Sequence, residues 1–251
     1  MIFTSERFAA FFHHNPSRVK ITGMKTRNSS VAPSRAAAKS PKTDATPARK
    51  SAAKAEPEPK PYHHGNLRES LLEAADTVLA RQGASNITLR DVAKEAGVSH
   101  AAPYHHFASL DDMLAAVAER GFNRLADAMA QPLALTDTRE RLLQICEAYV
   151  NCARAQPAQF RLMFGPLLAR KREYPALQVA AERGFGQLHA AACAHDPVGG
   201  SELALVGWSL AHGLSNLLID GVFDGLPMQL PAATVLTRQL AIRAIGASDT
   251  V

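Results

Sequence analysis

A block of three short helices with tight turns between them most constrains how this chain can fold. The block lies between Asn66 and Phe107, where residues that start and stop helices alternate. Apolar residues recur at helical spacing from Leu67 to Leu79, and Gly83 ends that helix because glycine adopts the left-handed conformation at little cost. Thr88 is placed to cap a second helix, and Gly97 then turns the chain.

The third predicted helix runs from His100 to His106 and is capped by Ser99. Its exposed face carries histidine, alanine and tyrosine in place of glutamate and lysine. A short tip of this kind after a tight turn is typical of a helix that enters a groove of DNA. The sequence therefore predicts a helix-turn-helix unit that contacts bases from the first turn of this helix. An imidazole can donate to guanine, and a methyl group can pack against thymine. The predicted base contacts are His100, Ala101 and Ala102.

Two stretches of the chain resemble the TetR-type transcriptional regulators, most closely the branch named for a Trp-His-Gly signature in its C-terminal domain. The first is ITLRDVAKEAGVSHAAPYHHF, and the second is GWSLAHGL, with Trp208, His212 and Gly213. The resemblance covers residues 62 to 246 and implies a ligand-responsive repressor that binds a palindromic operator in double-stranded DNA as a homodimer. It also implies phosphate contacts from Thr88, Arg90, Tyr104, His105 and His106. For Tyr104, packing on the protein surface is the alternative.

Downstream of this block the pattern is helical throughout, without the alternation that indicates strands. The predicted fold class is therefore all-α, with three parts. Residues 1–61 form a disordered basic tail, residues 62–109 a helix-turn-helix DNA-binding domain, and residues 110–251 a larger helical ligand-binding and dimerisation domain.

The segment from Ser201 to Asp220 is apolar on two faces, which a lone surface helix would not be. One face can serve the subunit core and the other a second copy of the chain. A later apolar helix can complete a four-helix contact between two subunits. The predicted dimer interface consists of Leu203, Val206, Gly207, Leu210, Leu214, Leu217, Leu236 and Leu240.

Trp208 and His212 are four residues apart, so their side chains meet on one helical turn. Two interpretations stay open: a packed Trp beside a His bonded to the backbone, or an aromatic wall and a switchable donor in a ligand site. The resemblance implies a cavity enclosed by the middle helices, and hence a small-molecule effector that is largely apolar. The predicted lining is Phe160, Met163, Phe164, Leu188, Trp208 and His212.

The net charge of +5 is unevenly distributed along the chain. Residues 1–61 hold twelve basic and four acidic side chains, a charge of +8, so the remainder carries −3. This tail is rich in Ala, Pro, Ser and Lys, and either solubilises the protein or contacts DNA phosphates without base preference. Leu110 stands where many family members carry a lysine that binds phosphate. The basic tail would offset the loss of this phosphate contact. We interpret the first 23 residues as an extension rather than a targeting peptide, and Met24 is an alternative start.

Several classes of protein are disfavoured by what the sequence lacks. No run approaches the roughly 18 to 20 apolar residues of a membrane span, so a cytoplasmic, nucleoid-associated protein is expected. Cys146, Cys152 and Cys193 form no C-x-x-C pair and are expected to be free thiols, with redox sensing as an unsupported alternative. The histidines show neither metal-ligand spacing nor a catalytic grouping, so no cofactor, metal or enzymatic activity is predicted. The alternative function is an architectural DNA-binding protein that senses no ligand.

Overall fold

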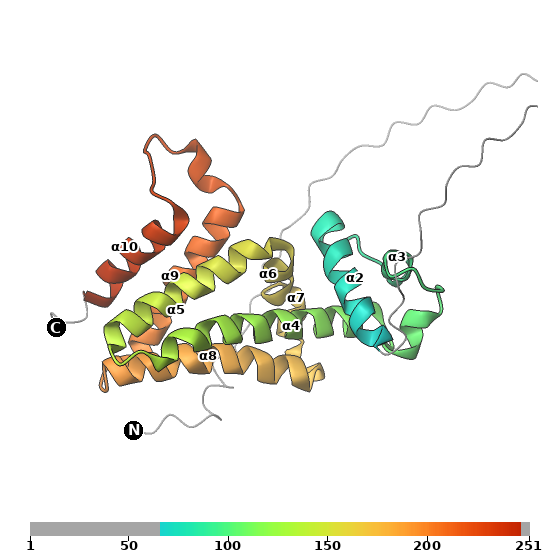
Figure 1. Ribbon diagram of the computed structural model, residues 1–251, viewed down its shortest axis with the longest axis horizontal. Helices are drawn as coiled ribbons and strands as arrows, with labels where there is room; N and C mark the ends of the chain where they lie inside the picture. Colours follow the sequence, from blue (N-terminus) through green and yellow to red (C-terminus); the bar gives the residue numbers. More distant parts are fainter. Residues whose placement is uncertain (1–65, 247–251) are drawn as a thin grey trace, which may run out of the picture. The chain divides into compact units, whose positions relative to one another are not determined.

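The computed structural model describes residues 66–246, apart from the side chains of residues 168 and 169, and every regular element in this range is a helix (Figure 1). The predicted all-α class is confirmed for the described residues. The predicted tail over residues 1–61 lies outside them.

The first two predicted helices form where their capping residues indicate. Helix α2 (Leu67–Gln82) begins after Asn66, whose side-chain oxygen accepts a hydrogen bond from the Glu69 amide at 3.2 Å. It ends at Gly83, which has a φ of 75°. Helix α3 (Leu89–Glu95) begins after Thr88, whose hydroxyl accepts from the Asp91 amide at 3.2 Å.

The third helix is shorter than the sequence predicted. Instead of a helix from His100 to His106, the structure contains the single 3₁₀ turn η1 (Ala102–His105). Proline has no N–H, so Pro103 cannot donate the α-helical bond to the residue four before it. The flanking amides bond three residues back instead: Ala102 to the Ser99 carbonyl at 3.0 Å and Tyr104 to the Ala101 carbonyl at 3.2 Å. Ser99 therefore supports the tip with its backbone and not, as predicted, with a side-chain cap.

The remaining helices form a layered bundle in which α8 lies along α4, and α9 and α10 pack on α5 (Figure 1). Prolines at the first position of α6 and α8 suit helix starts, because the N–H that proline lacks has no partner there. The helices are α4 (Leu110–Ala130), α5 (Thr138–Ala155), α6 (Pro157–Met163), α7 (Pro166–Ala169), α8 (Pro175–His195), α9 (Gly200–Ile219) and α10 (Ala233–Gly246). Three 3₁₀ turns join them: η2 (Gln131–Ala134), η3 (Lys171–Glu173) and η4 (Val222–Gly225).

Helix α4 connects the N-terminal helices to the bundle. Its first half packs against both α2 and α6, and its length continues beside α8 (Figure 1). Because α2 also contacts α6, any movement of α6 acts directly on the N-terminal helices as well as through α4. The boundary between the DNA-binding domain and the ligand-binding domain, at residues 109 and 110, remains a prediction.

By length and composition alone, helix α9 is apolar enough to cross a membrane, which the sequence analysis did not anticipate. Burial of one of its faces in the subunit core gives a second account of part of that composition. Leu203 and Leu214 lie in the subunit core at 4% exposure each, whereas Val206 and Leu217 are exposed at the surface. The helix thus has an inner and an outer apolar face.

Candidate nucleic-acid interface and effector site

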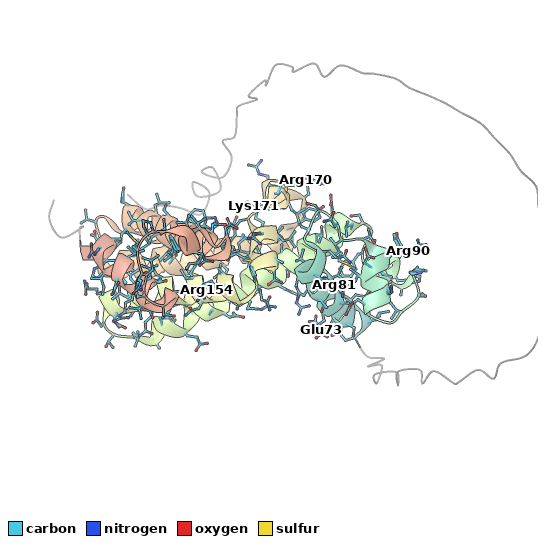
Figure 2. The ribbon with its side chains drawn as sticks, turned by 90° about the horizontal axis from the view of Figure 1, so that it is seen from above. Glu73, Arg81, Arg90, Arg154, Arg170 and Lys171 are labelled. Carbon is cyan, nitrogen blue, oxygen red and sulfur yellow. The ribbon has the colours of Figure 1, made fainter. Side chains whose placement is uncertain are left out.

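The tip of the N-terminal helices exposes most of the predicted DNA contacts. His100 and Ala101 are exposed on the turn before η1, and Tyr104 in η1 is 63% exposed. Figure 2 shows Arg90 at the outer end of the described structure, far from Arg154 of the bundle. The predicted phosphate contacts Thr88, Arg90, Tyr104, His105 and His106 are all exposed.

Ala102 does not fit its predicted role. It is buried, as is Pro103 beside it, because the 3₁₀ turn directs both side chains into the domain. Its methyl group is therefore not available to a thymine methyl. The base-contact prediction is left with His100 and Ala101.

Few cations of the N-terminal helices are available to phosphate. The guanidinium of Arg68 lies over the buried ring of Phe107, 5.4 Å from its centroid, and Arg81 pairs with Glu95 at 3.1 Å. Arg90 and Lys94 are exposed and make no ion pair with a described residue. Two acidic residues also lie in the first turn of α4, directly after the position where family members carry a lysine. The described helices therefore offer phosphate only a weak positive potential.

The predicted effector residues divide into separate groups. Phe160, Phe164 and His212 lie ring to ring, with the His212 centroid 5.3 Å from Phe160 and 4.5 Å from Phe164. Met163 instead faces α4, where its sulfur would lie 2.5 Å from a Cβ added at Gly121. Leu188 lies against the backbone of α9 near Gly207, and Trp208 packs edge-on against Phe185 at 5.4 Å. Trp208 also lies next to His212, with ring centroids 6.5 Å apart, so four of the six predicted residues belong to one ring cluster.

Tyr149 on α5 completes this cluster, although it was not among the predicted site residues. Its hydroxyl lies 3.0 Å from Nδ1 of His212 and also hydrogen-bonds the Trp208 side chain. The predicted backbone partner of His212 is thus replaced by a side chain. Sequence spacing carries no signal for this pair, since the two residues are 63 positions apart. The sequence offered one general indication: an imidazole expected inside the bundle, such as that of His212, needs a hydrogen-bond partner.

Two hydrogen bonds meet at the Tyr149 hydroxyl. The Trp208 indole can only donate, so the Tyr149 oxygen accepts from it, and the direction of the bond between this hydroxyl and Nδ1 of His212 follows the tautomer of the imidazole. Burial lowers the pKa of His212 and raises the pKa of Tyr149, so both groups are held neutral.

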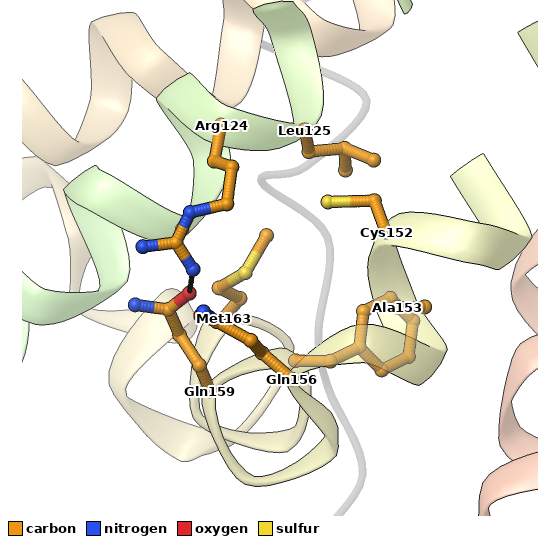
Figure 3. Close-up of a pocket in the computed structure, with 9 residues that line it drawn as sticks. Arg124, Leu125, Cys152, Ala153, Gln156, Gln159 and Met163 are labelled. Atoms are coloured by element: carbon orange, nitrogen blue, oxygen red, sulfur yellow. Dashed lines mark hydrogen bonds between the residues drawn. The ribbon is translucent and has the colours of Figure 1, made fainter. Parts of the chain in front are cut away.

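A small cavity lies between α4, α5 and α6, and only two predicted residues, Phe160 and Met163, line it (Figure 3). It has about 10 Å³ of free space, close to what one water molecule needs. Arg124 and Gln159 meet at one wall of it, with Nη1 of Arg124 donating to Oε1 of Gln159 at 2.8 Å. The remaining lining residues are Gly121, Leu125, Cys152, Ala153 and Gln156.

A larger, open hollow of about 300 Å³ lies beside the loop after α2 and helices α6 and α7. Both of its arginines are already paired: Arg161 with Asp220 at 2.5 Å and Arg170 with Asp111 at 2.7 Å. Since each guanidinium has a carboxylate partner, this hollow presents little uncompensated charge to a ligand.

Half of the predicted dimer contacts belong to the subunit's own core. Leu203 and Leu214 are 4% exposed, and Leu236 is 8% exposed. Gly207 is also buried, with the Leu188 side chain 3.6 Å from where a Cβ would lie. Leu210 and Leu240 are partly buried. The exposed apolar side chains of α9 and α10, which we call the outer face, are Leu205, Val206, Leu217, Val235 and Ile242.

The three cysteines are free thiols in the structure. Burial raises the pKa of Cys146 to about 12, which makes it a poor nucleophile at neutral pH. Among the described residues, no group of three His, Cys, Asp or Glu side chains is arranged to hold a metal ion.

Comparison with known proteins places both parts of the described chain. The family of bacterial regulatory proteins called tetR matches residues 71–117, and the tetracyclin repressor-like C-terminal domain matches residues 142–242. The HTH-type transcriptional regulator BetI of Cronobacter sakazakii is 29% identical over 184 residues, which cover 68% of this chain and 87% of that protein.

Two solved structures extend the likeness to the fold. A protein with unknown function from a Rhodococcus species is 29% identical, with a TM-score of 0.62 over 75% of this chain and 98% of that one. The TetR family transcriptional regulator PfmR from Thermus thermophilus is 21% identical, with a TM-score of 0.52 over 70% of this chain and 97% of that one. At that identity the second likeness concerns the fold alone.

Proposed function

We propose that this protein is a ligand-responsive repressor that acts as a homodimer on a palindromic operator. The premise is that the chain belongs to the TetR family of bacterial transcriptional regulators and carries its helix-turn-helix DNA-binding domain. The observation that carries the proposal is the exposed tip, where His100 and Ala101 lie beside the exposed phosphate-contact candidates. In this proposal the tip enters the major groove, and Thr88, Arg90, Tyr104, His105 and His106 position it on the backbone.

Homodimerisation is proposed through the outer face of α9 and α10. Val206 is 44% and Leu217 is 41% exposed, and their neighbours on the face are apolar as well. Contiguous exposed apolar side chains of this kind mark association surfaces. Pairing two copies also places two tips for half-sites that lie about one helical turn of DNA apart.

Effector binding is proposed within the bundle. A ligand lowers DNA affinity only if it binds the non-binding conformation better, and typical couplings amount to about 1–3 kcal/mol. The protein would act in the cytoplasm, on the DNA of the nucleoid. We propose no enzymatic activity, and membership of the Trp-His-Gly branch remains a prediction from Trp208 and His212.

An architectural DNA-binding protein that senses no ligand is the second candidate. The charge of +8 on residues 1–61, together with the small number of available cations on the N-terminal helices, favours it. Both candidates predict DNA binding, but only the repressor predicts release by a small molecule.

Selection of bound fragments from genomic DNA, with and without a panel of small molecules, tests this proposal. We expect enrichment of a palindromic sequence and its loss with at least one compound. Exchanging His100 and Ala101 should change the preferred sequence, whereas Tyr104→Phe should weaken all sequences alike. Each lost base contact should cost about 1–3 kcal/mol. Fragments without any common sequence would refute the repressor and favour the architectural protein.

A further inference from the structure

Gln159 on α6 is a buried polar residue that joins three helices. It is 5% exposed, and Nε2 donates to Oδ1 of Asp76 on α2 at 2.9 Å and to the Val117 carbonyl on α4 at 3.1 Å. Its Oε1 accepts from Arg124, also on α4. A buried amide whose groups are all satisfied by other helices fixes the positions of those helices. Gln159 therefore ties the N-terminal helices to the bundle.

The half-buried carboxylate of Asp76 depends on the hydrogen bond from Gln159. Burial raises its pKa, and Arg120, Arg124 and the Gln159 hydrogen bond each counteract that rise. Arg120 compensates it incompletely, because its Nη2 is 3.2 Å from Glu69 but 3.8 Å from Asp76. Loss of the Gln159 donor would leave a half-buried carboxylate short of hydrogen bonds, which favours a different position of α2.

Gln159 also forms part of the wall of the small cavity. Figure 3 shows Arg124 and Gln159 meeting at one wall of the cavity, opposite Leu125 and Cys152. Since the free space is only about 10 Å³, a molecule larger than water enters only if the lining moves. Opening at the wall formed by Arg124 and Gln159 breaks the bond between them.

The chemistry of the lining indicates what would break that bond. Among the described residues, Arg124 is the only charged one that lines the cavity, and Leu125, Phe160 and Met163 supply apolar surface. A guanidinium presents donors in a planar fork that matches a carboxylate with two parallel bonds, whereas the Gln159 amide offers one neutral acceptor. A carboxylate therefore displaces Gln159, and its hydrocarbon body packs on the apolar lining.

We propose that this cavity takes an apolar carboxylic acid whose carboxylate binds Arg124, and that the displaced Gln159 releases Asp76 and with it helix α2. The inference rests on the proposed function for its effect on DNA. It assigns to the effector an anionic end that the sequence analysis did not predict, and it centres the site on Arg124 rather than on Trp208.

Decanoate and decanol are suitable probes, because they share a chain and differ in the charged end. With the full-length protein, we expect calorimetry to show decanoate binding at least tenfold tighter than decanol, and Arg124→Met to lose that preference. Equal binding of the two probes, or unchanged decanoate binding by Arg124→Met, would overturn the carboxylate site. This measurement needs no DNA, so it stands even if the proposed repressor function fails.

The coupling is tested by fluorescence anisotropy on the selected operator. We expect decanoate to lower the operator affinity of the unaltered protein about tenfold. Gln159→Leu and the isosteric Gln159→Glu should both start about tenfold weaker and respond less than about twofold to decanoate. Gln178→Leu is the matched control, because among the described residues the side chain of this half-buried glutamine bonds within its own helix α8, to Glu182 at 2.8 Å.

Two results would overturn the coupling. One is a decanoate response in both Gln159 variants equal to that of the unaltered protein. The other is no response of the unaltered protein to decanoate when another compound does release the operator. In the second case the proposed repressor function would stand and only this inference would fall.

Discussion

The hydroxyl of Tyr149 offers the sharpest test of the ring cluster in the bundle. Tyr149→Phe removes one oxygen and leaves the packing of the ring in place. The change takes the partner from Nδ1 of His212, 3.0 Å away, and from the Trp208 N–H. Leaving a buried polar group unsatisfied costs about 1–3 kcal/mol, and both residues are only half-buried, so water can restore part of the loss. We expect a loss of about 2 kcal/mol in the free energy of unfolding, or roughly 4–8 °C in Tm.

Urea unfolding measures this change, with protein concentration held constant because the proposed dimerisation would contribute to apparent stability. Tyr104→Phe is the matched control: this ring is 63% exposed, so its hydroxyl stays in water in both states. We expect the control to lie within about 0.5 kcal/mol of the unaltered protein. A Tyr149→Phe variant as stable as the control would refute the hydrogen-bonded cluster and leave ring packing as the only role of Tyr149.

Three further changes test other parts of the molecule. The double change Val206→Glu and Leu217→Glu should yield monomers in sedimentation and lower the operator affinity at least tenfold. Val198 is 97% exposed and lies outside the outer face, so the control variant Val198→Glu should remain dimeric. Deleting residues 1–60 should flatten the slope of log operator affinity against log salt concentration by about 0.9 for each lost phosphate contact. An unchanged slope would show that these residues serve only to solubilise the protein. Burial lowers the pKa of His212 below its ordinary 6.5, so the unfolded chain binds more protons just below that pH and stability falls on acidification. His212→Gln should lessen that fall in urea midpoints between pH 7.5 and 5, and an identical pH dependence would contradict the burial of this imidazole.

The sequence identified those parts of the fold that depend on near neighbours. Thr88 caps α3 within its own first turn, and Gly83 ends α2 with positive φ, so each boundary is encoded within a few residues. The third helix was predicted wrongly because Ser99 as a cap carried more weight than the missing N–H of Pro103.

Contacts between distant segments were not predictable in the same way. Periodicity showed two apolar faces on α9 but not which of them meets the subunit core, so Leu203 and Leu214 were placed at the dimer interface. Tyr149 and Gln159 join helices far apart in sequence, and nothing in their local sequence indicates a partner. The exposed tip was predictable because its chemistry lies in one continuous stretch, whereas the proposed effector site is assembled from several helices.

The short helix α6 explains how a modest coupling energy can reach the DNA-binding helices. A helix of seven residues has little stability of its own, so its side-chain contacts determine its position. Gln159 holds it to α2 and α4, Phe160 packs against His212, and Met163 occupies the space left by the absent side chain of Gly121. A ligand that displaces one of these contacts shifts the whole helix, because so short a segment cannot bend to keep the others. Movement at the cavity and release of Asp76 therefore belong to one rearrangement, whose cost is a few hydrogen bonds of about 1 kcal/mol each. That cost matches the differential binding energy available from one charge-assisted carboxylate pair.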